Sequence, residues 1–140
     1  MASTRADKFT SVVKQEYFTD FLDNFDSHPV NNSLAKAVNE NSVKQSIRNL
    51  LLTNIGERLF QPTIGSNILY ALFEPNDIVT SENITSFVKS TITQNELRAV
   101  LLSVNVYPNP DQSSFDVNII FSLINSNIPI QMTVILKRVR

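Results

Sequence analysis

The last third of the chain alternates apolar with polar positions, which is the pattern of half-buried β-strands. The alternation occurs three times in succession. Its apolar members are Leu102, Val104 and Val106; then Phe115, Val117, Ile119, Phe121 and Leu123; then Ile128, Ile130, Met132, Val134 and Leu136. The short polar connections YPNPDQSS (107–114) and NSN (125–127) supply the turns. We therefore expect an antiparallel meander of three strands.

The segment that begins at Ser42 has apolar residues at helical spacing and predicts a first helix. Ser42 can act as its N-cap, and Gln45, three residues later, can complete a capping box. Gly56 adopts a positive φ without strain and is expected at the helix end or shortly after it. The apolar stripe of this helix consists of Val43, Ile47, Leu50 and Leu51.

Two further helices are expected before the strands begin. The first is short: it starts at Ser66 as its cap and stops before Pro75, because a residue that precedes proline avoids the α region. The second starts at Thr80 as its cap and ends at Asn95. Their apolar faces comprise Ile68, Leu69, Leu72 and Phe73 in the short helix, and Ile84, Phe87, Val88 and Ile92 in the longer one. This order predicts an α+β fold, with three helices packed on one face of a three-stranded antiparallel sheet.

The first 41 residues show no sustained period and contain the turn cluster DSHPVNN (26–32). Residues 1–13 have too few apolar side chains to offset the entropy of ordering them. With 140 residues, 42% of them hydrophobic, the chain has the size of one domain. We predict a flexible, extended N-terminal arm over residues 1–19 and a single domain over residues 20–140.

Composition argues against several classes of partner. Thirteen acidic and 12 basic residues give a formal charge of −1, so nothing attracts the whole chain to nucleic acid or to an anionic membrane. The chain has no cysteine and one histidine, His28, which leaves almost no ligands for zinc or haem. No run of about 18 apolar residues occurs. We expect no cofactor, no metal, and no nucleic-acid, membrane or small-molecule partner.

The acidic residues do not predict catalysis. Glu57, Glu74 and Glu96 are scattered over a helix end, a position before proline and a helix-to-strand junction, whereas a glycosidase needs paired carboxylates in one cleft. No Ser/His/Asp arrangement or phosphate-binding glycine loop is present. The chain is therefore expected to be non-enzymatic.

Both glycines of the chain lie in the segment NIGERLFQPTIGSNILYALFEP (54–75). The order Thr-x-x-Gly-Glu-Arg…Pro…Gly…Leu-Phe-Glu-Pro, followed by a helix and NELRA, resembles the baseplate wedge and sheath-initiator family of contractile phage tails. Relatives of that family occur in type VI secretion baseplates. The resemblance extends from about residue 20 to residue 140. The family is sometimes named as a lysozyme, a label that the scattered carboxylates do not support.

The resemblance implies a location and a set of partners. It places the protein in the virion tail baseplate, assembled in the host cytoplasm. The partners that it implies are other baseplate wedge proteins, through their helical core bundle, the tail sheath protein, and tube or hub proteins. A peptidoglycan-cleaving glycosidase and a free-standing adaptor domain outside any tail remain the alternatives.

The resemblance also implies roles for two short motifs. Gly56, Glu57, Arg58, Pro62 and Gly65 would form a rigid structural loop, in which ion pairs of the two charged residues hold the corner; the alternative for Glu57 and Arg58 is a direct contact with a partner. Glu96, Leu97 and Arg98 match the family's Glu-Pro-Arg motif except at the proline, and that motif is implicated in gripping the core bundle at an exposed corner. The alternative for the second motif is a local salt bridge that holds the helix-to-strand junction.

The last strand is a candidate for pairing with the sheath. It ends the chain and can lie at a sheet edge, which is a template for another strand. The expected pairing residues are Thr133, Val134, Ile135, Leu136, Lys137, Arg138 and Val139. Only Lys137, Arg138 and Arg140 would protect this edge, by their charge. Together these features predict a structural wedge component that clamps the core bundle and starts sheath assembly by strand exchange; the alternative for the strand is an ordinary protected edge.

Overall fold

The structure is a computed structural model that describes residue 15 and residues 17–138. Most of the predicted arm over residues 1–19, together with Val139 and Arg140 at the chain end, lies outside the described residues. The elements are β1 (Thr19–Phe21), β2 (Lys36–Val38), α1 (Glu40–Leu52), α2 (Ile68–Ala71), α3 (Ile78–Asn95), β3 (Ala99–Asn109), the 3-10 helix η1 (Pro110–Gln112), β4 (Ser114–Leu123) and β5 (Pro129–Lys137).

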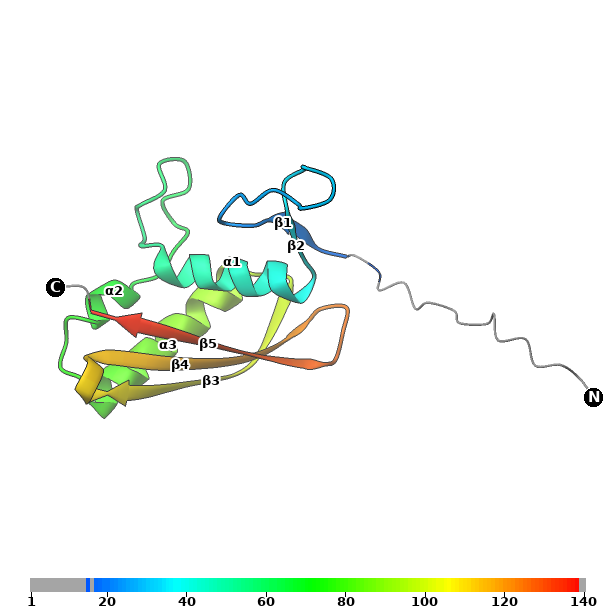
Figure 1. Ribbon diagram of the computed structural model, residues 1–140. Helices are drawn as coiled ribbons and strands as arrows, with labels where there is room; N and C mark the ends of the chain where they lie inside the picture. Colours follow the sequence, from blue (N-terminus) through cyan, green and yellow to red (C-terminus); the bar gives the residue numbers. More distant parts are fainter. Residues whose placement is uncertain (1–14, 16, 139–140) are drawn as a thin grey trace, which may run out of the picture.

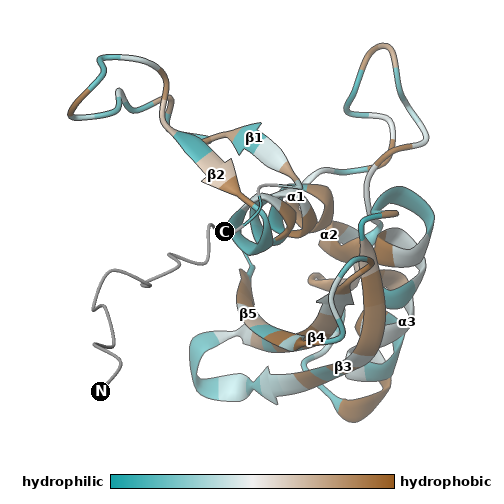
Figure 2. Ribbon diagram, turned by 90° about the vertical axis from the view of Figure 1, so that its right-hand side faces the viewer, coloured by the Kyte–Doolittle hydropathy of each residue, from teal (hydrophilic) through white to brown (hydrophobic). Residues whose placement is uncertain are grey.

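The predicted α+β fold is confirmed. Strands β3, β4 and β5 form an antiparallel sheet in that order, and the helices lie against one of its faces (Figure 1). The sheet curls around the helices, so that α1 and α3 lie inside the curve (Figure 2). The core fills the space between the layers, and all five alternating apolar residues of β4 are buried: Phe115, Val117, Ile119, Phe121 and Leu123.

The hairpin of β1 and β2 was not predicted from the sequence. Each strand has three residues, too few to show a period. The hairpin is held from outside by α1 and the residue before it: the Asn39 side-chain oxygen accepts hydrogen bonds from the backbone N–H groups of Tyr17 and Phe18, and Gln45 Nε2 donates to the Phe21 carbonyl oxygen. The strands therefore depend on tertiary contacts.

All three predicted helix caps were wrong. Helix α1 begins at Glu40, because Asn39 has a φ of 49° and turns the chain from β2 into the helix. Ser42 is buried inside α1, and Gln45 reaches β1 instead of completing a capping box. Helix α2 begins at Ile68 after Asn67, since the Ser66 hydroxyl donates to the Leu51 carbonyl oxygen, 2.8 Å away.

Helix α3 also begins earlier than predicted. Its N-cap is Asp77, whose carboxylate accepts the Thr80 backbone N–H at 2.8 Å. The first turn was missed because Ile78 and Val79 are exposed and do not belong to the buried stripe. The predicted end at Asn95 is confirmed.

A few apolar residues that were assigned to core faces are exposed. Leu102 lies at a bulge in β3, where the pairing register shifts between Leu101 and Ser103, so the bulged residue leaves the alternation. Ile128 is exposed because it lies in the connection before β5. Helix α2 has only one turn, so its stripe is buried at Ile68 and Leu72 and exposed at Leu69 and Phe73. The exposed residues of these sets are Leu69, Phe73, Leu102 and Ile128.

Candidate interaction surfaces

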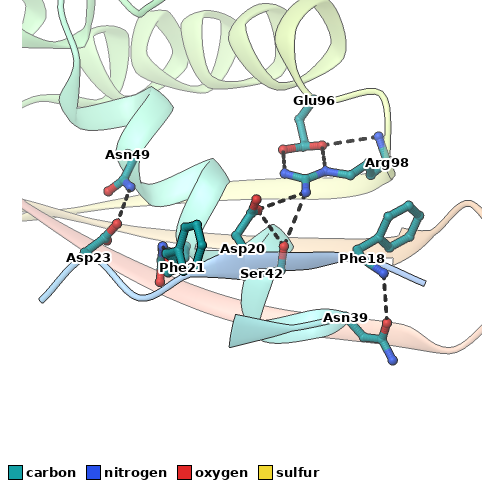
Figure 3. Close-up of polar contacts among 10 residues, drawn as sticks. Phe18, Asp20, Phe21, Asp23, Asn39, Ser42, Asn49, Glu96 and Arg98 are labelled. Atoms are coloured by element: carbon teal, nitrogen blue, oxygen red, sulfur yellow. Dashed lines mark hydrogen bonds and ion pairs between the residues drawn. The ribbon is translucent and has the colours of Figure 1, made fainter. Parts of the chain in front are cut away.

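Arg98 joins three elements at the end of α3 (Figure 3). Its Nε and Nη2 atoms donate to Oε1 and Oε2 of Glu96 at 2.8 and 2.9 Å, a bidentate pair. Its Nη1 donates to Asp20 Oδ2 of β1 at 3.0 Å and to Ser42 Oγ of α1 at 3.3 Å. The Ser42 hydroxyl in turn donates to Asp20. We call these four residues the Arg98 cluster.

The Arg98 cluster sets the pKa values of its acids. Burial alone would raise the pKa of Glu96, but hydrogen bonds from Arg98 and Ser46 and the charge of Arg98 outweigh it, and the pKa is lowered. The pKa of Asp20 is lowered by its hydrogen bond from Ser42 and then by Arg98. The pKa of Arg98 is raised, mainly by Glu96. The three charges are therefore present together at neutral pH.

The exposed corner that was expected at Glu96–Leu97–Arg98 is wrong for Glu96, whose residue surface is only 4% exposed. The local salt bridge that was kept as the alternative is present. Leu97 is the outward residue of the motif, with 78% of its surface exposed. A contact of this motif with a partner stays a prediction. Asp20 and Ser42 were missed, because they lie 78 and 56 positions from Arg98 and no local pattern connects them.

The loop between α1 and α2 is closed by its own backbone. The Gly56 N–H donates to the Pro62 carbonyl at 2.8 Å, and the Ser66 N–H donates to the Thr53 carbonyl at 2.8 Å. Glu57 Oε2 accepts the Asn54 N–H at 2.9 Å. The expected ion pairs of Glu57 and Arg58 were wrong: Glu57 binds backbone, and Arg58 has no ion pair among the described residues.

The two glycines of this loop should differ in their tolerance of a side chain. Gly65 has a φ of 141°, and an added Cβ would lie 2.8 Å from the backbone of Asn54. Gly56 has a φ of 87°, and its Cβ would meet nothing within 4 Å. Gly65→Ala should lower the free energy of unfolding by about 2–4 kcal/mol and Gly56→Ala by about 1–2 kcal/mol. Urea unfolding of both variants measures the difference, and equal losses would contradict the close approach at Gly65.

Two large apolar side chains extend from the middle of this loop. Leu59 and Phe60 are 92% and 98% exposed. Figures 1 and 2 show the loop projecting beyond α1, on the same side of the molecule as the hairpin of β1 and β2. The two side chains were not predicted as a surface feature. The available signal was two bulky apolar residues between two glycines, outside any helical or strand period.

Strand β5 lies at one edge of the sheet, and its hydrogen-bond phase can be assigned. The Arg138 N–H donates to the Ser113 carbonyl at 3.4 Å, in register with the other β4–β5 pairs. Bonded pairs alternate along antiparallel strands, so residues 130, 132, 134 and 136 bond to β4. The backbone groups that face the open edge belong to Gln131, Thr133, Ile135 and Lys137. Of the predicted pairing residues, Val134, Leu136 and Arg138 therefore direct their N–H groups toward β4 or the residue before it.

The opposite edge of the sheet, on β3, differs. The Ile124 N–H donates to the Arg98 carbonyl, so even-numbered residues of β4 bond to β3. Pro108 pairs with the odd-numbered Phe115, so its nitrogen faces away from β4. This edge thus contains a proline within the strand, whereas the only proline of β5 is Pro129 at its first residue. The edge of β5 is the more open template.

A groove of about 640 Å³ follows the middle of β5. One wall is the outer side of α1, which runs alongside β5 (Figure 1). At the end of the strand, the Arg138 guanidinium lies 5.3 Å from the ring centre of Phe73. The groove residues are Asp23, Asn24, Lys44, Gln45, Arg48, Leu52, Met132, Thr133, Val134 and Ile135.

In the described part of the chain, no helix has both the length and the apolar character needed to cross a bilayer. The histidine, aspartate and glutamate side chains within that part form no group of three or more that could hold a metal ion.

The chain is similar in sequence and in structure to proteins that are named as baseplate or tail components. Baseplate wedge protein gp25 of Enterobacteria phage T4 is 29% identical over 96 residues, which is 69% of this chain and 73% of that protein. The crystal structure of a Geobacter sulfurreducens protein named as a tail lysozyme is 25% identical, with a TM-score of 0.64 over 70% of this chain and 89% of that chain.

A chain in the anti-feeding prophage baseplate has the same fold, with a TM-score of 0.60 and 18% identity over 88% of this chain and 87% of that chain. The family model described as baseplate wedge protein gp25 matches residues 37–127, well over half of the chain. The family resemblance that the sequence suggested is thereby confirmed, and the chain belongs to the baseplate wedge protein gp25 family.

Proposed function

We propose that this protein is a structural component of the baseplate of a contractile tail and that it starts sheath assembly by accepting a strand at β5. The observation that carries the proposal is the open edge of β5. In the hydrogen-bond phase assigned above, the backbone N–H and C=O groups of four residues lie at this edge without a partner strand: Gln131, Thr133, Ile135 and Lys137. A strand that adds to such an edge gains backbone hydrogen bonds whatever its side chains are. Family membership supports the baseplate location.

Strand acceptance suits a sheath initiator for a physical reason. The resemblance implies that sheath subunits link to their neighbours by exchanging strands, so an initiator has to offer the same kind of edge. Backbone hydrogen bonds depend little on side-chain identity, and an unrelated protein can therefore imitate that edge. The tail sheath protein is the proposed partner at β5, in the virion tail, after assembly in the host cytoplasm.

A second contact, with the helical core bundle of other wedge proteins, is proposed at the end of α3. Because Glu96 is buried, the contact would be made by the exposed side chain of Leu97, with the accessible parts of Arg98 and Asp20 as its polar border. The Arg98 cluster then acts as a rigid support that fixes the direction of Leu97. A stiff support reduces the ordering cost of binding.

The projecting loop offers a third contact, with another baseplate protein. Leu59 and Phe60 are held on a loop that is already closed by backbone hydrogen bonds. Exposed apolar side chains in a rigid setting are typical of residues that anchor a protein interface. We place this contact among the wedge, hub or tube partners of the baseplate.

Peptidoglycan cleavage is the second candidate, because the Geobacter relative is named as a tail lysozyme. Against it, a general acid of a glycosidase needs a raised pKa, whereas the pKa of Glu96 is lowered. Glu57 accepts a backbone N–H inside the loop. We therefore propose a non-enzymatic role. Clearing of a peptidoglycan suspension that is lost in Glu57→Gln or Glu96→Gln would support the enzyme instead. The third candidate, a free-standing adaptor domain outside any tail, is tested by the genes that flank the gene of this protein: an adaptor would not be encoded beside other tail proteins.

Proline at Ile135 tests the strand proposal. Ile135 is half exposed and its N–H faces the open edge, a phase in which β5 already contains Pro129, so Ile135→Pro should fold. Baseplates that contain this variant should form but carry no sheath in electron micrographs. Ile135→Thr keeps the N–H and is the matched control, expected to give sheathed tails.

Two results would decide against the strand proposal. Normal sheath on tails that contain a folded Ile135→Pro protein would exclude the edge of β5 as the sheath contact. Val134→Pro should instead unfold the protein, since it removes a bond to β4 and a buried side chain. A folded Val134→Pro protein would show that the assigned hydrogen-bond phase is wrong.

A further inference from the structure

The groove beside β5 carries two positive charges on its helical wall. Lys44 and Arg48 are one turn apart on α1, and both line the groove. Among the described residues, neither belongs to an ion pair. Like charges at this spacing on a helix repel each other. The pair therefore imposes a small cost on α1 that an anionic group in the groove would remove.

The other groove residues neutralise only part of this charge. Asp23 is the one acidic residue of the lining, and its Oδ1 already accepts a hydrogen bond from Asn49 Nδ2 at 2.9 Å (Figure 3). The lining therefore carries two cations and one carboxylate. Its remaining members are amide, hydroxyl or apolar side chains.

The position of the groove relates this charge to the strand that β5 would accept. A strand added at the open edge places every second side chain on the helical side of the sheet. Side chains on that side extend past Met132 and Val134 toward α1, where they meet Lys44, Arg48 and Leu52. Same-side residues of a strand are about 6.6–6.8 Å apart, and neighbours one helical turn apart are about 5–6 Å apart. Two successive inward residues can therefore meet the two cations.

We propose that the segment accepted at β5 is acidic: an extended strand of the partner with carboxylates at two inward positions, i and i+2, opposite Lys44 and Arg48, and an apolar inward residue beside Leu52. This inference rests on the proposed strand acceptance and adds the chemistry by which the partner is selected. The backbone ladder provides adhesion, and the two cations select an acidic strand over a neutral or basic one.

The test uses the full-length protein and the purified, unassembled sheath protein of the same tail system as the probe. Lys44→Glu/Arg48→Glu should weaken binding at least about 30-fold at low salt, because two attractive contacts become repulsive. Raising the salt concentration should weaken wild-type binding and strengthen binding by the double variant. Lys89→Glu reverses one positive charge on an exposed residue of α3, outside the groove, and should bind within about twofold of wild type.

Parallel measurements separate the two proposals. If Ile135→Pro binds the sheath protein like wild type, strand acceptance at β5 is wrong, and the acidic-strand inference is overturned with it. If Ile135→Pro abolishes binding while Lys44→Glu/Arg48→Glu binds like wild type at every salt concentration, strand acceptance remains and the charge inference is overturned. Lys44→Gln/Arg48→Gln, which introduces no new charge, should give an intermediate loss, and wild-type binding by this variant would also contradict the inference. Unchanged circular dichroism of the variants confirms that they are folded.

Discussion

Replacing Arg98 by alanine should lower the free energy of unfolding by about 2–4 kcal/mol. The loss of one partner of a buried ion pair commonly costs about 3–5 kcal/mol, because the remaining charge is left without compensation. Glu96 is 4% exposed and would be that charge. The expected loss is about 1 kcal/mol below that range because 29% of the Arg98 side-chain surface is exposed to solvent, which screens the pair. A domain of this size is stable by about 5–15 kcal/mol, so the loss is a large fraction of its stability.

The expected loss depends on pH in a defined direction. The folded-state pKa values of Glu96 and Asp20 are lowered, so their stabilising contribution is complete above the ordinary values of 4.5 and 3.8 and is lost as the pH falls through the folded-state values. Without Arg98, burial would raise the pKa of Glu96, and acid would then neutralise an uncompensated charge. The difference between wild type and Arg98→Ala should therefore be largest at neutral pH and shrink below about pH 4.5.

Urea unfolding at pH 7 and at pH 4 measures both effects. Arg48→Ala is the matched control, since this exposed arginine has no ion pair among the described residues and should change stability by less than about 0.5 kcal/mol. The double variant Glu96→Gln/Arg98→Ala should lose less than the sum of its two single variants. Additive losses, or a difference that does not change with pH, would show that the Arg98 cluster does not hold the junction.

The Arg98 cluster also marks the limit of local sequence reasoning. Most of helix α3 and of strands β3 to β5 follows from period, because each is long enough to repeat its pattern several times, but the first turn of α3 and the bulge in β3 do not. The cluster instead depends on Asp20 and Ser42, which only the folded chain brings to Arg98. The family resemblance identified Glu96 and Arg98 as a functional motif, but it led us to expect both side chains at an exposed corner of the protein. Whether such a pair holds the junction together or contacts a partner depends on how deeply it is buried. The hydrophobic period of the sequence does not predict burial at a helix-to-strand junction, because neither the helical nor the strand period continues through it.

The same limit explains the helix starts. A cap was expected at the polar residue nearest the first buried apolar position, as at Thr80. The first turn of α3 is exposed, however, so its true cap, Asp77, lies further upstream. At α1, a tertiary contact takes the expected cap: the Ser42 hydroxyl donates to the Asp20 carboxylate, so it is not available to cap the helix. Capping rules identify suitable residue types, and the surrounding fold selects among them.

The loop from Gly56 to Gly65 was predicted from the sequence in part. Its two glycines predicted unusual backbone geometry, and the structure gives both a positive φ. The purpose of the geometry was not visible in the sequence, because exposure of Leu59 and Phe60 depends on how far the loop projects from α1. The exposure of two bulky apolar side chains on a closed loop is the observation that supports the proposed contact with another baseplate protein.

Leu59→Ser/Phe60→Ser should leave the isolated protein as stable as wild type but remove it from assembled baseplates. The two side chains are 92% and 98% exposed, so their loss on the free protein removes almost no buried area, and the free energy of unfolding should change by less than about 0.5 kcal/mol. In an interface, burial of a leucine and a phenylalanine contributes about 1.5–3 kcal/mol each. Their joint loss should therefore weaken the contact at least about 100-fold.

Incorporation of tagged protein into purified baseplates measures this effect. The matched control is Ile78→Ser/Val79→Ser, which removes two exposed apolar side chains from the first turn of α3 and should be incorporated normally. Single variants divide the effect, and Phe60→Ser should cost more than Leu59→Ser because aromatic anchors dominate interfaces. Two outcomes would contradict the contact: wild-type incorporation of Leu59→Ser/Phe60→Ser, or a loss of stability in the isolated variant, which would show that the loop tip packs on its own protein. A selective loss of incorporation would instead make the loop a preformed anchor, whose glycines set the direction in which two apolar side chains enter a neighbouring subunit.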